Sequence, residues 1–179
     1  MELYLERGFD QTTVAEIAER AGLTERTFFR YFGDKREVLF RGDELAQSMV
    51  AELEKLPSSV PALAAVEAAL ASASDFFEER RPLSVKRQTV IDANPALQER
   101  ELSKLASMAE LMGAALRRRG VSETAAALTA QAGVAVFRVA FQRWQEDPAR
   151  HVFAAHLRDA MEELKSVAQE STSPSSRGR

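Results

Sequence analysis

The chain has 179 residues, of which 45% are apolar and 28% charged, so it can bury a core and is not disordered over most of its length. It contains no cysteine, which excludes disulfides, thiolate metal sites and cysteine nucleophiles. The net charge of −3 argues against nucleic-acid binding by the surface as a whole, although a local basic surface remains compatible with it.

Apolar residues recur at helical spacing along the chain, which predicts an all-α protein. Thr13 is placed to cap a helix that starts near Val14, with Glu16 completing a capping box, and Ala21-Gly22 ends it. Thr24 caps a second short helix that closes before Gly33.

A third, longer helix is expected from Asp34 to about Leu56, followed by a break at Pro57-Ser-Ser-Val-Pro61. Beyond this break the sequence becomes rich in alanine and its periodic segments lengthen. Proline and glycine then divide the chain into further predicted helices. These helices are expected at residues 62–80, 83–92, 95–119, 122–146 and 149–168.

The two short helices and the tight Ala21-Gly22-Leu23 turn between them predict a helix-turn-helix. In such a motif the second helix lies in the DNA major groove with its N-terminal residues at the base edges. Arg26 is the candidate for a bidentate contact to guanine, and Lys35 suits a phosphate contact. The candidate DNA-binding residues are Thr13, Thr24, Glu25, Arg26, Thr27, Arg30, Tyr31 and Lys35.

The segment from Gly8-Phe-Asp-Gln-Thr-Thr-Val-Ala-Glu-Ile-Ala18 through Ala21-Gly-Leu-Thr-Glu-Arg-Thr-Phe-Phe-Arg-Tyr-Phe-Gly-Asp-Lys-Arg-Glu-Val-Leu39 resembles the DNA-binding domain of TetR-type transcriptional regulators. The resemblance covers residues 3–45. It implies a helical homodimer joined through its last two long helices, with a small-molecule pocket in the C-terminal domain whose occupancy releases DNA. The expected domains are a helix-turn-helix domain (1–45), a ligand-binding and dimerisation domain (46–169) and a disordered tail (170–179).

One departure from the family lies at the N-terminus. The family's first helix normally starts well before the Gly-Phe pair and carries a basic lead, whereas here Met1 falls inside it, so a truncated first helix is expected. Residues 1–56 contain eight basic and twelve acidic side chains, but residues 24–36 contain four basic and two acidic ones. A local basic surface is therefore retained on the predicted recognition helix.

The C-terminal part is similar to an actinobacterial subgroup thought to sense acyl-CoA or fatty-acyl ligands, on the segments Arg80-Arg-Pro-Leu-Ser84 and Val139-Ala-Phe-Gln-Arg-Trp144. A small hydrophobic or acyl-type effector is therefore expected. Apolar and methionine side chains could line its pocket, although the alternative for each is ordinary core packing. The candidate pocket residues are Phe76, Phe77, Met108, Met112, Phe137, Phe141 and Trp144.

Two helices are expected to form the homodimer interface. Small side chains along residues 122–145 would permit close helix contact, and the last helix presents apolar residues at near-heptad spacing, although packing within one protomer would explain the same pattern. The dimer would place two recognition helices about one DNA turn apart, which predicts a near-palindromic operator. The apolar residues of the last helix are Val152, Phe153, Leu157, Met161 and Leu164.

Enzymatic function is not expected, because the chain lacks nucleophile-elbow, phosphate-loop and zinc-protease motifs. His151 and His156 would point roughly 140° apart on one helix, so neither a metal site nor a cofactor is predicted. No secretory signal and no membrane span is recognised, so a soluble, cytoplasmic protein is expected.

The sequence therefore predicts a ligand-responsive transcriptional repressor in which the effector moves the helix from Asp34 to Leu56. The alternative is a helical ligand-binding or interaction module whose helix-turn-helix is defective, because its first helix is incomplete, and does not bind DNA.

Overall fold

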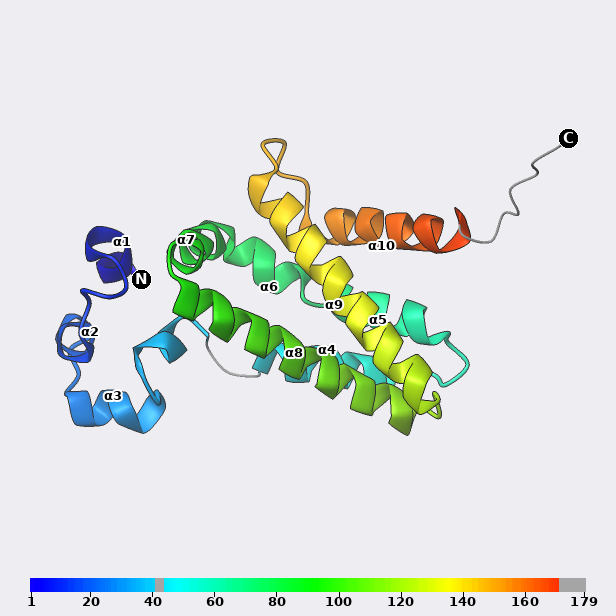
Figure 1. Ribbon diagram of the computed structural model, residues 1–179, viewed down its shortest axis with the longest axis horizontal. Helices are drawn as coiled ribbons and strands as arrows, with labels where there is room; N and C mark the ends of the chain where they lie inside the picture. The colour runs from blue at the N-terminus through cyan, green and yellow to red at the C-terminus, as the bar shows by residue number, and fades with distance from the viewer. Residues whose placement is uncertain (41–43, 171–179) are drawn as a thin grey trace, which may run out of the picture. The chain divides into compact units, whose positions relative to one another are not determined.

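The computed structural model describes residues 1–40 and 44–170, and within these ranges the regular structure is entirely helical (Figure 1). The predicted all-α fold class is confirmed. The helices are α1 (Glu2–Arg7), α2 (Val14–Arg20), α3 (Glu25–Tyr31), the 3-10 helix η1 (Lys35–Val38), α4 (Glu44–Lys55), α5 (Ala62–Ala71), α6 (Ser74–Glu79), α7 (Arg81–Asp92), α8 (Pro95–Arg118), α9 (Glu123–Glu146) and α10 (Phe153–Glu170).

Several predicted helix boundaries differ from those of the structure; the last helix, for example, begins at Phe153 and not at residue 149. The expected helix from Asp34 to Leu56 is two elements, η1 and α4, and the three residues 41–43 between them lie outside the described residues. The helix expected at residues 62–80 is divided between α5 and α6, where the Ser72 hydroxyl donates to the Ala69 carbonyl at 2.7 Å. Glu170, assigned to the tail, belongs to α10, and the predicted disorder of 171–179 falls outside the described part of the chain.

The chain forms two compact units. Unit 1 comprises Met1–Ser48 and Arg80–Met108; unit 2 comprises Met49–Glu79 and the chain from Ala109 onward. Helices α4 and α8 each supply residues to both units. This division differs from the expected boundary after residue 45, because α7 and the first half of α8 group with the helix-turn-helix segment.

The core of unit 1 joins α1 and the η1 segment to α7 and α8. The Tyr4 hydroxyl donates to the Lys35 carbonyl at 2.6 Å. Arg87 donates from Nε to the Leu39 carbonyl at 2.8 Å and pairs with Glu101 at 3.0 Å. Burial lowers the pKa of Arg87, and Glu101 opposes that effect. The buried apolar side chains of this core are Tyr4, Phe9, Leu39, Phe40, Val90, Ile91 and Leu97.

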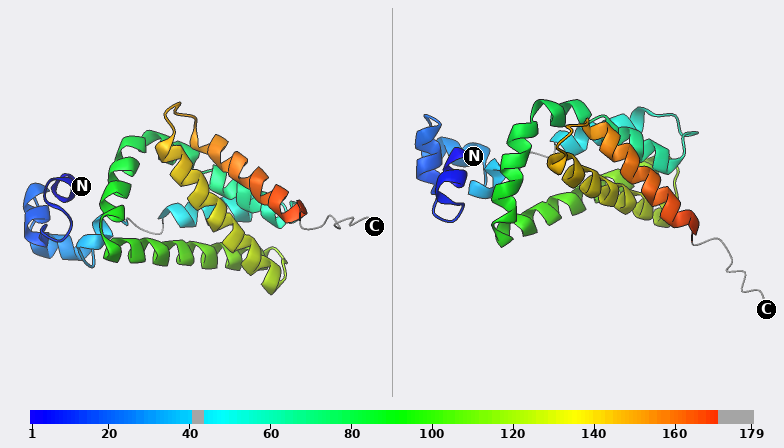
Figure 2. Two further views of the ribbon diagram at one scale, coloured as in Figure 1. Left: turned by 45° about the horizontal axis from the view of Figure 1, so that its top comes forward. Right: turned by 90° about the horizontal axis from the view of Figure 1, so that it is seen from above.

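In unit 2 the helices α5, α9 and α10 pack against one another, as the views in Figure 2 show. Gly133 of α9 lies so close to α5 that a Cβ atom there would clash with Val66 Cγ1. Ala126 and Ala130 of α9 are also buried. These small residues thus serve, at least in part, to pack helices within one protomer.

The apolar residues predicted to form the dimer interface on the last helix are mostly committed to the same core. Phe153, Leu157 and Met161 are buried within the protomer, whereas Val152 is exposed. Their near-heptad spacing therefore reflects the contact of α10 with α5 and α9. The expectation that these residues mediate dimerisation is wrong for the three buried ones.

By length and composition α9 is apolar enough to cross a membrane, contrary to the expectation from the sequence. Its contacts with α5 and α10 and its buried residues, which include Val134, Val136 and Trp144, are those of a core helix.

Arg119, which directly follows α8, forms hydrogen bonds with the end of α4 and with the linker after it. Its guanidinium donates to the carbonyls of Leu53 at 3.0 Å, Pro57 at 2.8 Å and Val60 at 3.2 Å, and also to that of Leu56. Four carbonyls at and beyond a helix C-terminus are thereby satisfied by one side chain.

Candidate nucleic-acid interface

Helix α2 starts at the predicted capping box. The Thr13 hydroxyl accepts from the Glu16 amide at 3.2 Å, and the Glu16 carboxylate accepts from the Thr13 amide at 2.8 Å. Arg7 of α1 pairs with the same carboxylate at 2.6 Å. The hydrogen bonds from Thr13 lower the pKa of Glu16, and Arg7 adds to the effect.

The turn between α2 and α3 is built on Gly22. Its φ of 67° is left-handed, a conformation that side chains disfavour. The Leu23 amide donates to the Ala18 carbonyl at 2.8 Å and the Gly22 amide to the Glu19 carbonyl at 3.0 Å. This pattern is a Schellman motif, so the predicted tight helix-turn-helix turn is present.

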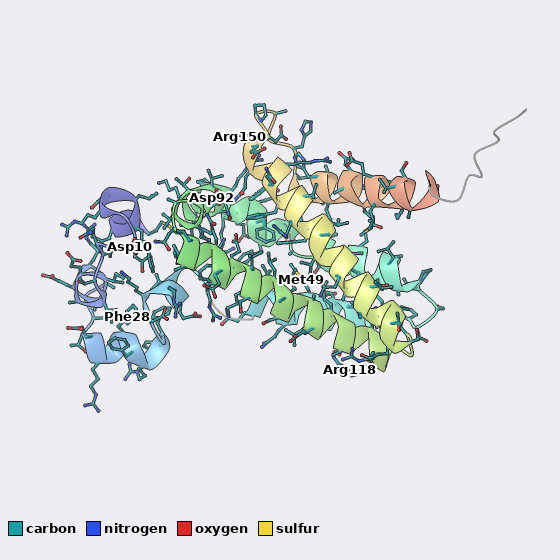
Figure 3. All side chains as sticks on the ribbon, in the orientation of Figure 1. Asp10, Phe28, Met49, Asp92, Arg118 and Arg150 are labelled. Carbon is teal, nitrogen blue, oxygen red and sulfur yellow. The ribbon has the colours of Figure 1, made fainter. Side chains whose placement is uncertain are left out.

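Helix α3 presents one buried face and one exposed face. Thr24 caps it by accepting from the Thr27 amide at 3.2 Å. Phe28, labelled in Figure 3, is buried and packs against Phe32 with ring centroids 5.1 Å apart. Glu25 and Arg26 in the first turn are exposed. The helix is thus fixed through Phe28 while its N-terminal polar residues remain available to a ligand.

Arg26 is the less constrained of the two arginines of α3. Its side chain makes no hydrogen bond or ion pair with any residue that the structure describes. In contrast, Arg36 pairs with Asp34 at 2.6 Å, and Arg30 lies over the Tyr31 ring at 4.9 Å. Because Tyr31 is exposed, the Arg30–Tyr31 pair also faces solvent at the end of α3.

Lys35 makes contacts within the protein that the sequence did not predict. Its ammonium donates to the carbonyls of Phe9 at 2.8 Å, Asp10 at 3.2 Å and Thr12 at 2.9 Å, and lies 4.4 Å from the centroid of the Phe9 ring. An ammonium has three donors, and all three are used inside the protein. This geometry favours a positioning role for Lys35 over a phosphate contact.

Both parts of the chain match known protein families. Residues 1–41 match the model of the bacterial regulatory proteins of the tetR family, and residues 60–169 match the MftR C-terminal domain. The chain belongs to the TetR family of transcriptional regulators. The family predicted from the Gly8–Leu39 motif is therefore confirmed, and the C-terminal domain is of the MftR type.

Relatives of this TetR-family chain include a protein of Mycobacterium tuberculosis named as a mycofactocin biosynthesis transcriptional regulator, MftR, which is 32% identical over 127 residues. The alignment covers 69% of this chain and 63% of that protein, so the chain spans less than two thirds of its relative.

Two solved structures share the fold. The fatty acid degradation regulator FadR of Bacillus halodurans matches with a TM-score of 0.61 and 15% identity, over 91% of this chain and 92% of that one. Thermus thermophilus FadR, solved in complex with lauroyl-CoA, matches with a TM-score of 0.57 and 19% identity, over 100% and 94%.

The sequence interpretation missed Phe29 on the TetR-family recognition helix. Phe29 is 53% exposed, and its ring meets that of buried Phe28 edge-on at 5.5 Å. Adjacent residues lie roughly 100° apart around a helix, so the Phe28-Phe29 pair already indicated that one ring would face outward. An exposed aromatic ring there could contact a thymine methyl group.

The predicted pocket residues are mainly packed against one another. The Phe77 ring lies 5.8 Å from Phe137, 5.1 Å from Phe141 and 5.9 Å from Trp144. Met112 is fully buried in unit 2, Phe76 is exposed, and Met108 belongs to unit 1. A solvent-open depression of about 700 Å³ on unit 1 is lined by none of these seven residues.

Proposed function

We propose that the chain is a ligand-responsive DNA-binding regulator, a repressor that a small molecule releases from a near-palindromic operator. The observation that carries this proposal is the exposed first turn of α3, where Arg26 is unpaired among the described residues while Phe28 anchors the helix. Such a surface suits insertion into a major groove.

Within this proposal, side chains of α3, of its N-cap and of the α2 N-cap contact the DNA. Arg26 donates to guanine, Glu25 accepts from cytosine, and Phe29 contacts a thymine methyl group. The remaining polar side chains hold the DNA backbone without reading its sequence. These backbone-contacting residues are Thr13, Thr24, Thr27, Arg30 and Tyr31.

The regulator would act as a homodimer through surfaces of α9 and α10 that the protomer core leaves exposed. Leu128 and Val139 of α9 are 67% and 42% exposed. They are eleven residues apart, about three helical turns, and so lie on one face. A two-fold axis at this face would pair two recognition helices and read both halves of an operator.

The effector would be a small hydrophobic or acyl-type molecule bound by the MftR-type domain. Supporting this class, the T. thermophilus FadR structure holds lauroyl-CoA. The aromatic cluster around Phe77 would have to open to admit such a ligand. A protein that acts on operator DNA in this way would work in the cytoplasm.

The test is operator binding by an arginine variant and a matched control. Fluorescence anisotropy would follow binding to the intergenic DNA beside the protein's own gene, and to sites selected from random sequence. Arg26→Ala should weaken specific binding by about 1–3 kcal/mol and relax preference at one base position. Lys86→Ala removes a positive charge from an exposed position on α7 and should leave specificity unchanged.

Two results would contradict the proposal. Equal operator affinity and preference in wild type and Arg26→Ala would remove Arg26 from the interface. The absence of specific binding to any selected site at low salt would favour the helical ligand-binding or interaction module that does not bind DNA.

A further inference from the structure

Both histidines of the chain lie beside one carboxylate where α9 is joined to α10. His151 comes from the connecting loop and His156 from α10. Asp147 ends α9, and its Oδ2 lies 2.8 Å from His151 Nδ1 and 3.1 Å from His156 Nε2. One ligand atom from each of the three side chains can be chosen so that all lie within 4.8 Å of one another.

The local backbone explains why sequence spacing failed to predict this cluster. His151 is not on a helix: α10 begins at Phe153, so only His156 is helical. Arg150, labelled in Figure 3, adopts a left-handed φ of 57°, and the Asp147 carboxylate accepts from the amides of Ala149 at 2.8 Å and His151 at 2.7 Å. This turn brings His151 back toward Asp147.

The donor set matches a borderline transition metal. Imidazole nitrogen and carboxylate oxygen are ligands of Zn²⁺ and Co²⁺, and three protein ligands leave a position for water. Tetrahedral ligands at about 2.0–2.2 Å from Zn²⁺ lie roughly 3.3–3.6 Å from one another, so the nitrogen-to-oxygen separations of 2.8 and 3.1 Å would lengthen by a few tenths of an ångström when the ion binds.

Burial and charge also suit a cation. The Asp147 and His156 side chains are 10% and 14% exposed, whereas that of His151 is 66% exposed, which leaves a way in from solvent. An aspartate carboxyl group ionises well below neutral pH. The carboxylate is therefore negative at neutral pH.

We propose that Asp147, His151 and His156 bind one divalent transition-metal ion, with water completing its coordination. The ion would link the C-terminal end of α9 to the first turn of α10. The site goes beyond DNA and effector binding and does not depend on either.

Zinc binding to the full chain tests the proposal directly. The protein is freed of any histidine tag and treated with a chelator, and Zn²⁺ is then titrated in competition with a chromogenic chelator. One equivalent of Zn²⁺ should bind saturably and raise Tm, because a ligand of the folded state stabilises it. Co²⁺ at the same site should give the absorption bands of a nitrogen- and oxygen-ligated ion.

Two variants distinguish this site from surface carboxylates. His156→Gln removes a ligand and should weaken Zn²⁺ binding at least about tenfold. Asp159→Asn removes an exposed carboxylate on α10 and should not change it. Fluorescence of Trp144, the single tryptophan and fully buried, reports whether each variant is folded.

The proposal is overturned if wild type binds no Zn²⁺ saturably, in which case the cluster is only a hydrogen-bonded clamp. It is equally overturned if folded His156→Gln binds Zn²⁺ as tightly as wild type.

Discussion

The hydrogen bonds of Lys35 predict that its mutation reduces the stability of the fold. Its ammonium holds three carbonyls of the segment between α1 and α2. Lys35→Met leaves these carbonyls without their charged donor, so the free energy of unfolding should fall by about 1–3 kcal/mol. Thermal and denaturant unfolding would measure the loss, with Lys86→Met as the exposed control.

DNA binding by the same variant separates the two roles of Lys35. If Lys35 is a positioning residue, the slope of log affinity against log salt should stay unchanged at temperatures where the variant is folded. A slope smaller by about one, with unchanged stability, would instead restore the phosphate contact expected from the sequence.

Glu16 provides a pH-dependent contribution to stability. Its pKa is lowered in the folded state, so its contribution is complete above the ordinary value of 4.5 and is lost as pH falls through the lowered value. Between about pH 5 and pH 3, Tm of wild type should fall more steeply than Tm of Glu16→Gln, which has no carboxylate to protonate. Parallel curves would show that the capping box contributes nothing through its charge.

At the residue scale, the sequence alone predicted side-chain contacts correctly where a short local motif determines them. Thr13, Glu16 and Thr24 cap their helices as predicted, because caps depend on neighbours within one turn. Lys35 was not predictable, because its partners lie more than 20 residues away in the sequence. The His151–His156 spacing was misjudged because the left-handed turn at Arg150 carries no glycine signal.

At the scale of elements, Gly133 and Gly113 make a matched pair for testing helix packing. Gly133→Ala places a methyl group against Val66 of α5, a β-branched side chain with restricted rotamers, and should destabilise unit 2 by about 1–3 kcal/mol. In Gly113→Ala on α8 the new methyl group would lie 3.8 Å from its nearest neighbours, which include Ala130 Cβ, and this is an ordinary van der Waals distance. The free energy of unfolding should therefore stay unchanged or rise by up to about 1 kcal/mol through helix propensity.

A double variant identifies the cause of the Gly133 effect. Val66→Ala removes the clashing methyl groups, so the loss in Gly133→Ala/Val66→Ala should be smaller than the sum of the single losses. Additive losses measured by denaturant unfolding would mean that contact with Val66 is not the cause.

Element boundaries were predictable where proline or a cap marks them and failed where tertiary contacts end a helix. Pro95 begins α8 as expected. The periodic pattern from Val38 to Leu53 gave no sign of a break, yet the Leu39 carbonyl is bonded by Arg87, 48 residues further on. No local pattern reveals a contact between residues so far apart in the sequence.

At the scale of the whole molecule, two helices belong to both compact units. The helix that the sequence analysis expected the effector to move, from Asp34 to Leu56, is replaced by the shorter α4, and Arg119 donates hydrogen bonds to carbonyls at its C-terminal end. The sequence predicted the two helices of the helix-turn-helix, their caps and the turn between them. The pocket could not be predicted with equal success, because apolar residues at helical spacing look alike whether they line a ligand site or, like Phe77 and Phe137, pack together.

The proposed homodimer is tested by a charge on its exposed face. Leu128→Asp places a carboxylate where an apolar side chain would be buried between protomers, so the dimer dissociation constant should rise at least about tenfold. Sedimentation velocity over a concentration series measures it. Operator affinity should fall with it, since a monomer contacts one half-site. Leu102→Asp, at a 54% exposed leucine of α8, is the control. A folded Leu128→Asp protein that dimerises as tightly as wild type would place the interface elsewhere.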